Sequence, residues 1–165
     1  MLKLQAKTNL MAIEIERKFL VDHEKWQQLA KPDAMHFRQG YIFSDEKKTI
    51  RVRVTDTEAY ITIKGGTAGF SRSEFEYTIP KTDGIQLLDN FAVSELEKYR
   101  YNINYAGKLW EVDVFVSDNE GLLMAEIELD SEDEKFDLPP WVTTEVTGDK
   151  RYYNSFLSAN PFKSW

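Results

Sequence analysis

Residues 13–19 of the chain read Ile-Glu-Ile-Glu-Arg-Lys-Phe. Apolar and polar side chains alternate through most of this stretch, and alternate residues of a β-strand point to opposite faces of the sheet. Glu14, Glu16 and Lys18 therefore share one face, and apolar residues share the other. The stretch predicts a strand whose polar face carries charges of both signs.

The same period of two recurs along most of the chain. It predicts strands at residues 13–20, 37–43, 49–56, 58–64, 72–80, 97–105, 108–115, 122–130 and 142–146. Helical spacing of apolar residues, with capping residues at the ends, predicts helices at residues 22–31, 82–92 and 149–159. Many short strands with few helices indicate an antiparallel barrel or sandwich.

The polar faces of these strands carry like charges two residues apart. They include Arg51 with Arg53, Glu14 with Glu16, Glu74 with Glu76, Glu111 with Asp113, and Glu126 with Glu128. Like charges on one face repel unless an opposite charge lies between them. One interpretation is the solvated outer face of a sandwich. The alternative is a closed barrel whose lumen holds the charges, where a divalent cation would neutralise the carboxylates and a polyanion the arginines.

Composition excludes several classes of protein. The 165 residues suit one domain, and the 21 basic and 28 acidic residues give a net charge of -7, which disfavours nucleic acid as a partner. The absence of cysteine excludes disulfides and thiol catalysis, and the two histidines disfavour a histidine metal site. The sequence has neither a membrane-spanning run of apolar residues nor a signal peptide, so we expect a cytoplasmic protein. Residues 1–10 are interpreted as a leader and residues 11–165 as a single domain.

The Glu-x-Glu-x-Lys sequence at Glu14, Glu16 and Lys18 resembles the signature of the CYTH superfamily, also called triphosphate tunnel metalloenzymes. The resemblance extends from Met11 to the C-terminus. It includes, in order, Gln39-Gly-Tyr41, Arg51-Val-Arg53, Ile61-Thr-Ile-Lys64-Gly65, Glu74-Phe-Glu76, Lys98-Tyr-Arg100, Trp110-Glu-Val-Asp113, Glu126-Ile-Glu128 and Glu145-Val-Thr147. It implies a mainly β fold, a closed eight-stranded antiparallel β-barrel with a few flanking helices. The barrel would form a tunnel that binds a triphosphate with Mg²⁺ or Mn²⁺.

The resemblance also implies a role for each charged residue of the tunnel. The implied metal ligands are Glu14, Glu16, Glu126 and Glu128. The implied phosphate-binding residues are Lys18, Arg51, Arg53, Lys64, Arg72, Lys98 and Arg100. The candidate catalytic residues are Glu14, Lys64, Glu76 and Asp113, and the sequence does not choose which carboxylate, Glu74 included, orients the attacking water. For each carboxylate, a salt bridge to a basic residue of the tunnel is the alternative interpretation.

The function that we expect is metal-dependent hydrolysis of inorganic triphosphate or of a small organic triphosphate, by in-line attack of water on the terminal phosphorus. The short chain leaves little room for a dedicated module that would bind an organic group or RNA. The alternatives are a class IV adenylate cyclase, a thiamine triphosphatase and a non-catalytic module that binds triphosphate or polyphosphate. No nucleic acid or membrane partner is expected, and an apolar outer face also suits a homodimer.

Overall fold

The computed structural model describes residues 15–65 and 73–165. Two predicted site residues, Glu14 and Arg72, lie outside the described residues, and so does the predicted leader at residues 1–10. All nine predicted strands and all three predicted helical regions have counterparts in the described part of the chain.

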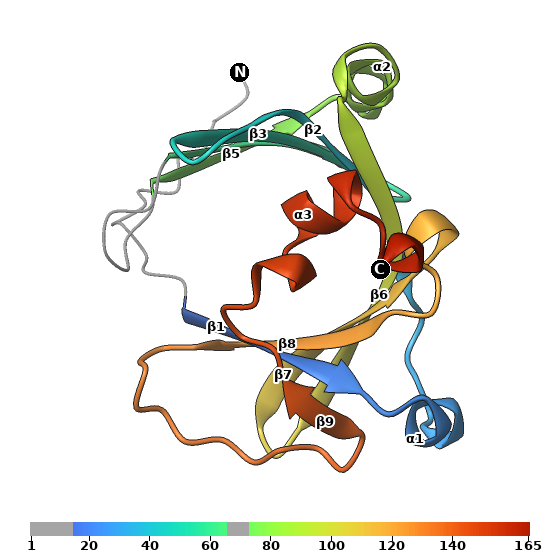
Figure 1. Ribbon diagram of the computed structural model, residues 1–165, viewed down its shortest axis with the longest axis vertical. Helices are drawn as coiled ribbons and strands as arrows, with labels where there is room; N and C mark the ends of the chain where they lie inside the picture. The colour runs from blue at the N-terminus through green and yellow to red at the C-terminus, as the bar shows by residue number, and fades with distance from the viewer. Residues whose placement is uncertain (1–14, 66–72) are drawn as a thin grey trace, which may run out of the picture.

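Nine antiparallel strands form one sheet that curls around a central space (Figure 1). The strands follow each other in space in the order β5-β4-β3-β2-β6-β7-β8-β1-β9. Their bounds are β1 Ile15–Val21, β2 Met35–Ser44, β3 Lys48–Val54, β4 Ala59–Gly65, β5 Glu74–Ile79, β6 Ser94–Tyr105, β7 Lys108–Phe115, β8 Leu123–Leu129 and β9 Val142–Glu145. The predicted fold class, a mainly β, barrel-like antiparallel fold with a few helices, is confirmed.

The sheet differs from the expected eight-stranded closed barrel in its edges. The short strand β9 pairs with β1 on the side that faces away from β8, with Phe19 opposite Glu145 and Val21 opposite Val142. Next to β9, Trp141 is buried, and its carbonyl accepts a hydrogen bond from Asp22 N at 2.9 Å. This anchoring holds β9 beside β1. Within residues 15–65 and 73–165, β5 and β9 are the two edge strands and no pairing joins them.

Two helices cover the convex face of the sheet (Figure 1). In α1, His23–Gln28, the Asp22 side chain accepts a hydrogen bond from Lys25 N at 3.0 Å, which confirms the predicted N-cap. The buried Trp26 of α1 packs edge-on against Trp141. The second helix, α2 at Lys81–Phe91, places Leu88 in a cluster of buried apolar residues on β3 and β4. In the part of the chain that the structure describes, no helix has the length and apolar character needed to cross a membrane.

Gly84 allows α2 to lie close to the sheet. A Cβ atom at this position would lie 2.6 Å from Ala59 Cβ and 3.0 Å from Val54 Cγ2. We therefore expect Gly84→Ala to lower the free energy of unfolding by about 1–3 kcal/mol, because the helix must move away from a packed surface. Urea denaturation measures the effect, and the exposed Gln86→Ala on the same helix is the control. Equal stability of the two variants would contradict the close packing.

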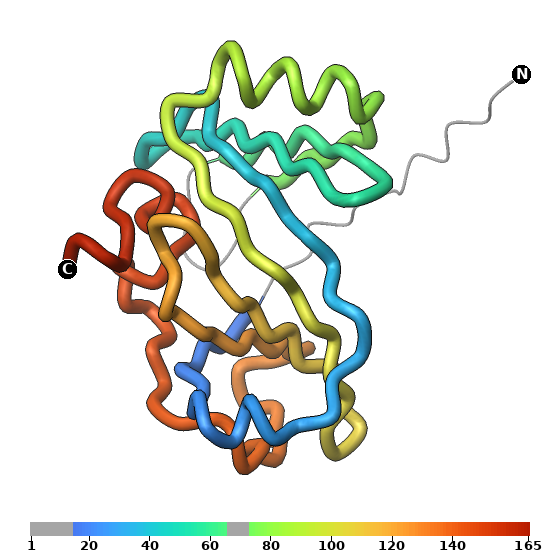
Figure 2. The backbone as a smooth tube through the Cα atoms, turned by 90° about the vertical axis from the view of Figure 1, so that its right-hand side faces the viewer, coloured from blue at the N-terminus to red at the C-terminus, as the bar shows by residue number. Residues whose placement is uncertain are grey.

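The third helical region differs from its prediction in continuity and in place. The expected helix at residues 149–159 is split into a 3-10 turn, η2 at Lys150–Tyr152, and a short helix, α3 at Asn154–Ala159, because the backbone of Tyr153 is extended. Helix α3 lies inside the curl of the sheet (Figure 1), and the C-terminal segment lies toward one end of the sheet (Figure 2). Two further 3-10 turns are η1, Ser117–Asn119, and η3, Phe162–Ser164.

Helix α3 lies on the concave face because that face has an apolar end. Leu157 of α3 is fully buried there in one cluster with Leu96, Phe115, Leu122 and Met124. The side chains of Ser94 and Ser158 share a hydrogen bond at 2.9 Å. Helix α3 therefore differs from the flanking helices α1 and α2 and covers one end of the concave face. We call this the α3 end.

Candidate functional site

The concave face that receives α3 also carries the charged residues. On β6, Leu96 contacts α3, and Lys98 and Arg100 follow at the two-residue spacing of one strand face. Directly opposed residues of neighbouring strands lie on the same face of a sheet. This face therefore continues through the opposed pairs Arg53 with Gln39, Arg51 with Tyr41, Arg51 with Thr62, Thr62 with Glu76, Lys64 with Glu74, Arg100 with Asp113, Glu111 with Glu126, Lys18 with Glu126, and Glu16 with Glu128. The predicted site residues in the described part of the chain are thus gathered on the concave face, which favours the charged lumen over a solvated outer face.

Arg51 and Arg53 of β3 form a basic region with little compensating negative charge. Arg51 Nη2 lies 3.1 Å from Thr62 Oγ1 and 3.4 Å from Glu76 Oε2, and Arg53 Nη2 lies 3.5 Å from the same Glu76 oxygen. The Nε atoms of both arginines are buried without a hydrogen-bond partner among the described residues. Burial and the neighbouring charge of Arg51 lower the pKa of Arg53. These two guanidiniums can therefore accept an additional anion.

Beside the two arginines, Lys64 Nζ of β4 pairs with Glu74 Oε2 of β5 at 2.8 Å. Glu76 accepts a hydrogen bond from Thr62 Oγ1 at 2.8 Å, and 36% of its side chain is exposed. Sequence reasoning did not assign a role to Thr62, whose hydroxyl holds Glu76 between the two arginines. The only signal in the sequence was its place on the polar face of its strand.

Asp113 lies at the centre of a second, fully buried region. Its Oδ2 accepts from Lys98 Nζ at 2.6 Å, and the Arg100 guanidinium donates to both carboxylate oxygens at 2.7 Å. Burial raises the pKa of Asp113, but the charges and hydrogen bonds of Lys98 and Arg100 outweigh burial and hold it well below its ordinary value. Asp113 is 0% exposed, and both of its oxygens are already bonded. In this arrangement Asp113 positions two cations, and Glu76 is more accessible for orienting a water.

Lys98 is buried under α3. Its side chain is 2% exposed, and Nζ donates to Asn154 Oδ1 at 3.4 Å in addition to Asp113. Burial lowers the pKa of Lys98, and the charge of Asp113 partly offsets that effect. Lys98 is therefore next to the predicted phosphate site but is covered by α3 in this structure. The sequence analysis did not identify Asn154, and no sequence pattern marks it.

Three of the predicted metal ligands, Glu16, Glu126 and Glu128, are described, and they lie on the neighbouring strands β1 and β8. Lys18 Nζ bridges Glu16 and Glu126, at 2.5 Å from the Glu126 carboxylate, and Glu126 also accepts from Arg100 Nη2 at 3.2 Å. Glu16 lies directly opposite Glu128. Burial, and after it the charge of Glu126, raise the pKa of Glu16, although Lys18 and Arg100 act in the opposite direction.

A hard divalent cation takes carboxylate oxygens as ligands, and these glutamates are ligands of that chemical type. Two glutamates face each other across the strand pair, and Glu126 follows on the same face. The described residues do not gather three or more acidic or histidine side chains at one point that could hold a metal ion. Instead, the Lys18 ammonium lies between Glu16 and Glu126.

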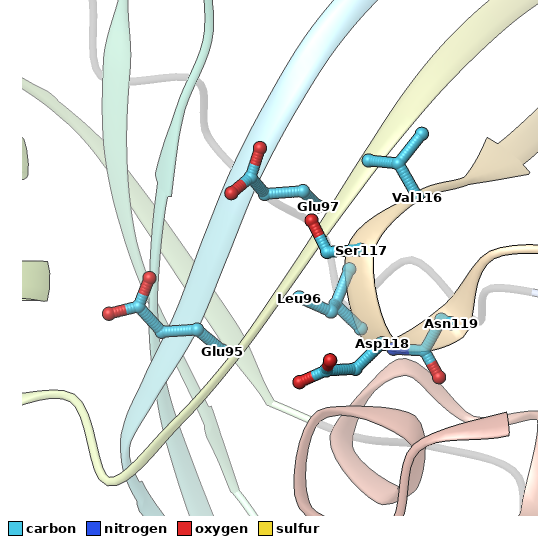
Figure 3. Close-up of a pocket in the computed structure, with 7 residues that line it drawn as sticks. All are labelled: Glu95, Leu96, Glu97, Val116, Ser117, Asp118 and Asn119. Atoms are coloured by element: carbon cyan, nitrogen blue, oxygen red, sulfur yellow. The ribbon is translucent and has the colours of Figure 1, made fainter. Parts of the chain in front are cut away.

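Two cavities lie along the sheet, and their linings differ in charge. One, of about 310 Å³, lies on the concave face away from α3 and includes Arg53, Arg100 and Phe37. The other, of about 160 Å³ (Figure 3), is lined by Glu95, Leu96, Glu97, Val116, Ser117, Asp118 and Asn119. Arg38 and His36 engage the two glutamates of the second cavity. None of the described residues that line it is basic, so the second cavity does not suit a phosphate.

The concave face of this curved antiparallel sheet carries guanidinium nitrogens without partners among the described residues, and carboxylates that face each other across strand pairs. These features define the class of proteins that bind a polyanion inside a curved β-sheet. The chain belongs to the CYTH family, because the CYTH domain model matches residues 12–153.

Relatives of known activity are similar over nearly the whole chain. The inorganic triphosphatase of Acetivibrio thermocellus is 46% identical over 156 residues, which are 94% of this chain and 99% of that protein. The inorganic triphosphatase of Nitrosomonas europaea is 38% identical over 149 residues, 88% of this chain and 96% of that protein. A crystal structure of an inorganic triphosphatase superposes with a TM-score of 0.64 at 36% identity and covers 88% of this chain and 93% of the other.

Proposed function

We propose that this protein is a divalent-metal-dependent hydrolase of inorganic triphosphate. The observation that carries the proposal is the pair Arg51 and Arg53, which share one Glu76 oxygen and keep two buried Nε atoms without partners. A guanidinium grips phosphoryl oxygens with two parallel hydrogen bonds, so an inorganic polyanion would satisfy these atoms. The similarity to two inorganic triphosphatases supports the same substrate.

In the proposed reaction, Arg51, Arg53 and Arg100 bind the phosphate oxygens and hold the chain in line for attack. Glu76 orients a water toward the terminal phosphorus, while Asp113 keeps Arg100 in position. Glu16, Glu126 and Glu128, with Glu14 from outside the described residues, would hold Mg²⁺ or Mn²⁺. Such an ion neutralises charge on the phosphoryl oxygens when it is bound. Lys64 and Lys18 supply further positive charge beside the substrate.

One assay tests this function. The protein is incubated with tripolyphosphate, ATP or thiamine triphosphate, each with Mg²⁺ or Mn²⁺, and the products are identified. Orthophosphate released chiefly from tripolyphosphate is the expected result. Cyclic AMP with pyrophosphate would instead indicate a class IV adenylate cyclase, preferred cleavage of thiamine triphosphate a thiamine triphosphatase, and no turnover a binding module.

A cytoplasmic location is supported by the absence of cysteine, and the single domain and the homodimer stay predictions.

Glu16→Gln tests the metal site separately. We expect the activity at a fixed Mn²⁺ or Mg²⁺ concentration to fall at least about tenfold, because even groups that only support metal ligands change metal affinity or activity by that amount. The metal concentration needed for half-maximal activity should rise, and the circular dichroism spectrum should not change. Glu132→Gln, on an exposed loop, is the control with the same change of charge. An unchanged metal requirement would remove Glu16 from the metal site.

A further inference from the structure

The larger cavity on the concave face opens away from the α3 end. We call it the mouth pocket; its volume is about 310 Å³, and its lining consists of Pro32, Asp33, Met35, Phe37, Arg53, Arg100, Asn102 and Glu111. Met35 is 47% exposed and Asp33 is exposed, so the mouth pocket reaches the protein surface. It is continuous with the proposed phosphate site, because Arg53 and Arg100 belong to both.

The inner face of β6 shows how the two ends of the concave face differ. Ser94, Leu96 and Lys98 lie under α3, where they contact Ser158, Leu157 and Asn154 respectively. The next two residues on this face, Arg100 and Asn102, line the mouth pocket. A linear substrate that is longer than the phosphate site therefore extends into the mouth pocket, because α3 covers the opposite end.

Among the described lining residues, Arg53 and Arg100 are the basic ones, and both lie at the inner wall of the mouth pocket. The Arg53 and Arg100 guanidinium carbons lie 5.2 Å and 5.5 Å from the centre of the Phe37 ring. The other described lining residues are apolar, neutral or acidic: Pro32, Asp33, Met35, Asn102 and Glu111.

The charges of the acidic lining residues are balanced to different degrees. Glu111 pairs with Arg100, whereas no basic side chain of the described residues pairs with Asp33. Lys31, two residues before Asp33, is held away because its Nζ donates to the carbonyls of Trp26 and Leu29. An additional phosphate beside Asp33 would meet a negative charge and apolar side chains, and the described lining residues offer no cation beyond Arg53 and Arg100 at the inner wall.

We propose that Asp33, together with the neighbouring Met35, sets the length of the inorganic polyphosphate that the site accepts, so that chains longer than triphosphate are disfavoured at the mouth pocket. This proposal rests on the proposed function. The physical basis is a difference in the surroundings that the phosphates of a triphosphate and an additional phosphate meet. A phosphate beside the arginines meets positive charge, whereas a further phosphate in the mouth pocket is placed where like charge and apolar surface oppose it.

The test compares tripolyphosphate with tetrapolyphosphate as substrates of the full chain with Mg²⁺. In Asp33→Lys, we expect the ratio of kcat/KM for tetrapolyphosphate to kcat/KM for tripolyphosphate to rise about fivefold or more at low ionic strength. The change should shrink in about 0.5 M salt, because exposed charges are screened. Met35→Lys, which also adds positive charge at an exposed position of the mouth pocket, should raise the ratio in the same direction.

Asp133→Lys is the matched control, since it makes the same change of charge on an exposed loop that does not line the mouth pocket. It should leave the ratio as in the unchanged protein. An unaltered ratio in both Asp33→Lys and Met35→Lys, or an equal rise in Asp133→Lys, would overturn the proposal. Failure of the unchanged protein to cleave tripolyphosphate would instead overturn the proposed function, so the two failures are distinguishable.

Discussion

Replacing Asp113 by asparagine is expected to lower the free energy of unfolding by about 3–5 kcal/mol, because it leaves the buried charges of Lys98 and Arg100 without their common partner. Asp113 and Lys98 are 0% and 2% exposed, so solvent does not compensate the loss. Natural domains have a total stability of about 5–15 kcal/mol. The substitution therefore removes a large part of the margin, and urea denaturation followed by circular dichroism measures it.

Two further variants separate an electrostatic effect from a packing effect. Glu120→Gln breaks an exposed ion pair with Lys163 and is expected to change stability by no more than about 0.5 kcal/mol. Adding Lys98→Met to Asp113→Asn removes the buried Lys98 charge that has lost its carboxylate partner, and part of the lost stability should return. If the double variant is less stable than Asp113→Asn alone, the loss is not caused by the unpaired charge of Lys98.

Arg53→Ala is expected to reduce kcat/KM for tripolyphosphate by about 10- to 150-fold without loss of stability. The first part follows from removing a hydrogen bond to a charged group, which contributes about 1.5–3 kcal/mol. The unchanged stability follows from the surroundings of Arg53 when no substrate is bound. Arg53 lies beside Arg51, its buried Nε has no partner, and its pKa is lowered by burial and by Arg51. Removing Arg53 therefore relieves repulsion while it removes a substrate contact.

Steady-state kinetics and thermal denaturation together check this prediction. Arg53→Lys keeps the charge but loses the two-pronged guanidinium, so its activity should lie between those of the unchanged protein and Arg53→Ala. Lys163→Ala removes a positive charge that is paired with Glu120, away from the concave face, and should leave kcat/KM unchanged. Unchanged affinity for tripolyphosphate in Arg53→Ala would exclude Arg53 from the phosphate site.

Several features of the fold could be predicted from local sequence. The alternation of charged and apolar residues placed Glu16 and Lys18 on one face of β1, and the paired like charges at Arg51 and Arg53 raised the alternative of a charged lumen. The N-cap at Asp22 followed from residues close in sequence, whereas α1 ends at Gln28, three residues before the predicted end at residue 31. These signals are readable because a strand face and a helix cap depend on neighbours within a few residues.

Other features depend on contacts between distant segments. Period-two alternation cannot say whether the third helix lies outside or inside the curl, and Leu157 is on the inside because it meets Leu96, Phe115 and Met124 from strands remote in sequence. The different roles of the acidic residues also depend on contacts between distant segments. Asp113 and Glu76 have equivalent places in their strand patterns, yet Asp113 is enclosed by Lys98 and Arg100 while Glu76 keeps an exposed carboxylate.

The sequence by itself determined the antiparallel sheet, the charged face and the family, because these depend on residue type and local spacing. Only the tertiary structure decided which cations face substrate, which are held by Asp113, and which end of the concave face is closed by α3. The physical reason is that burial and pairing are set by strand register and by packing between segments that are far apart in the chain. A charge two residues along a strand can therefore be predicted, but its partner 15 or 56 positions away cannot.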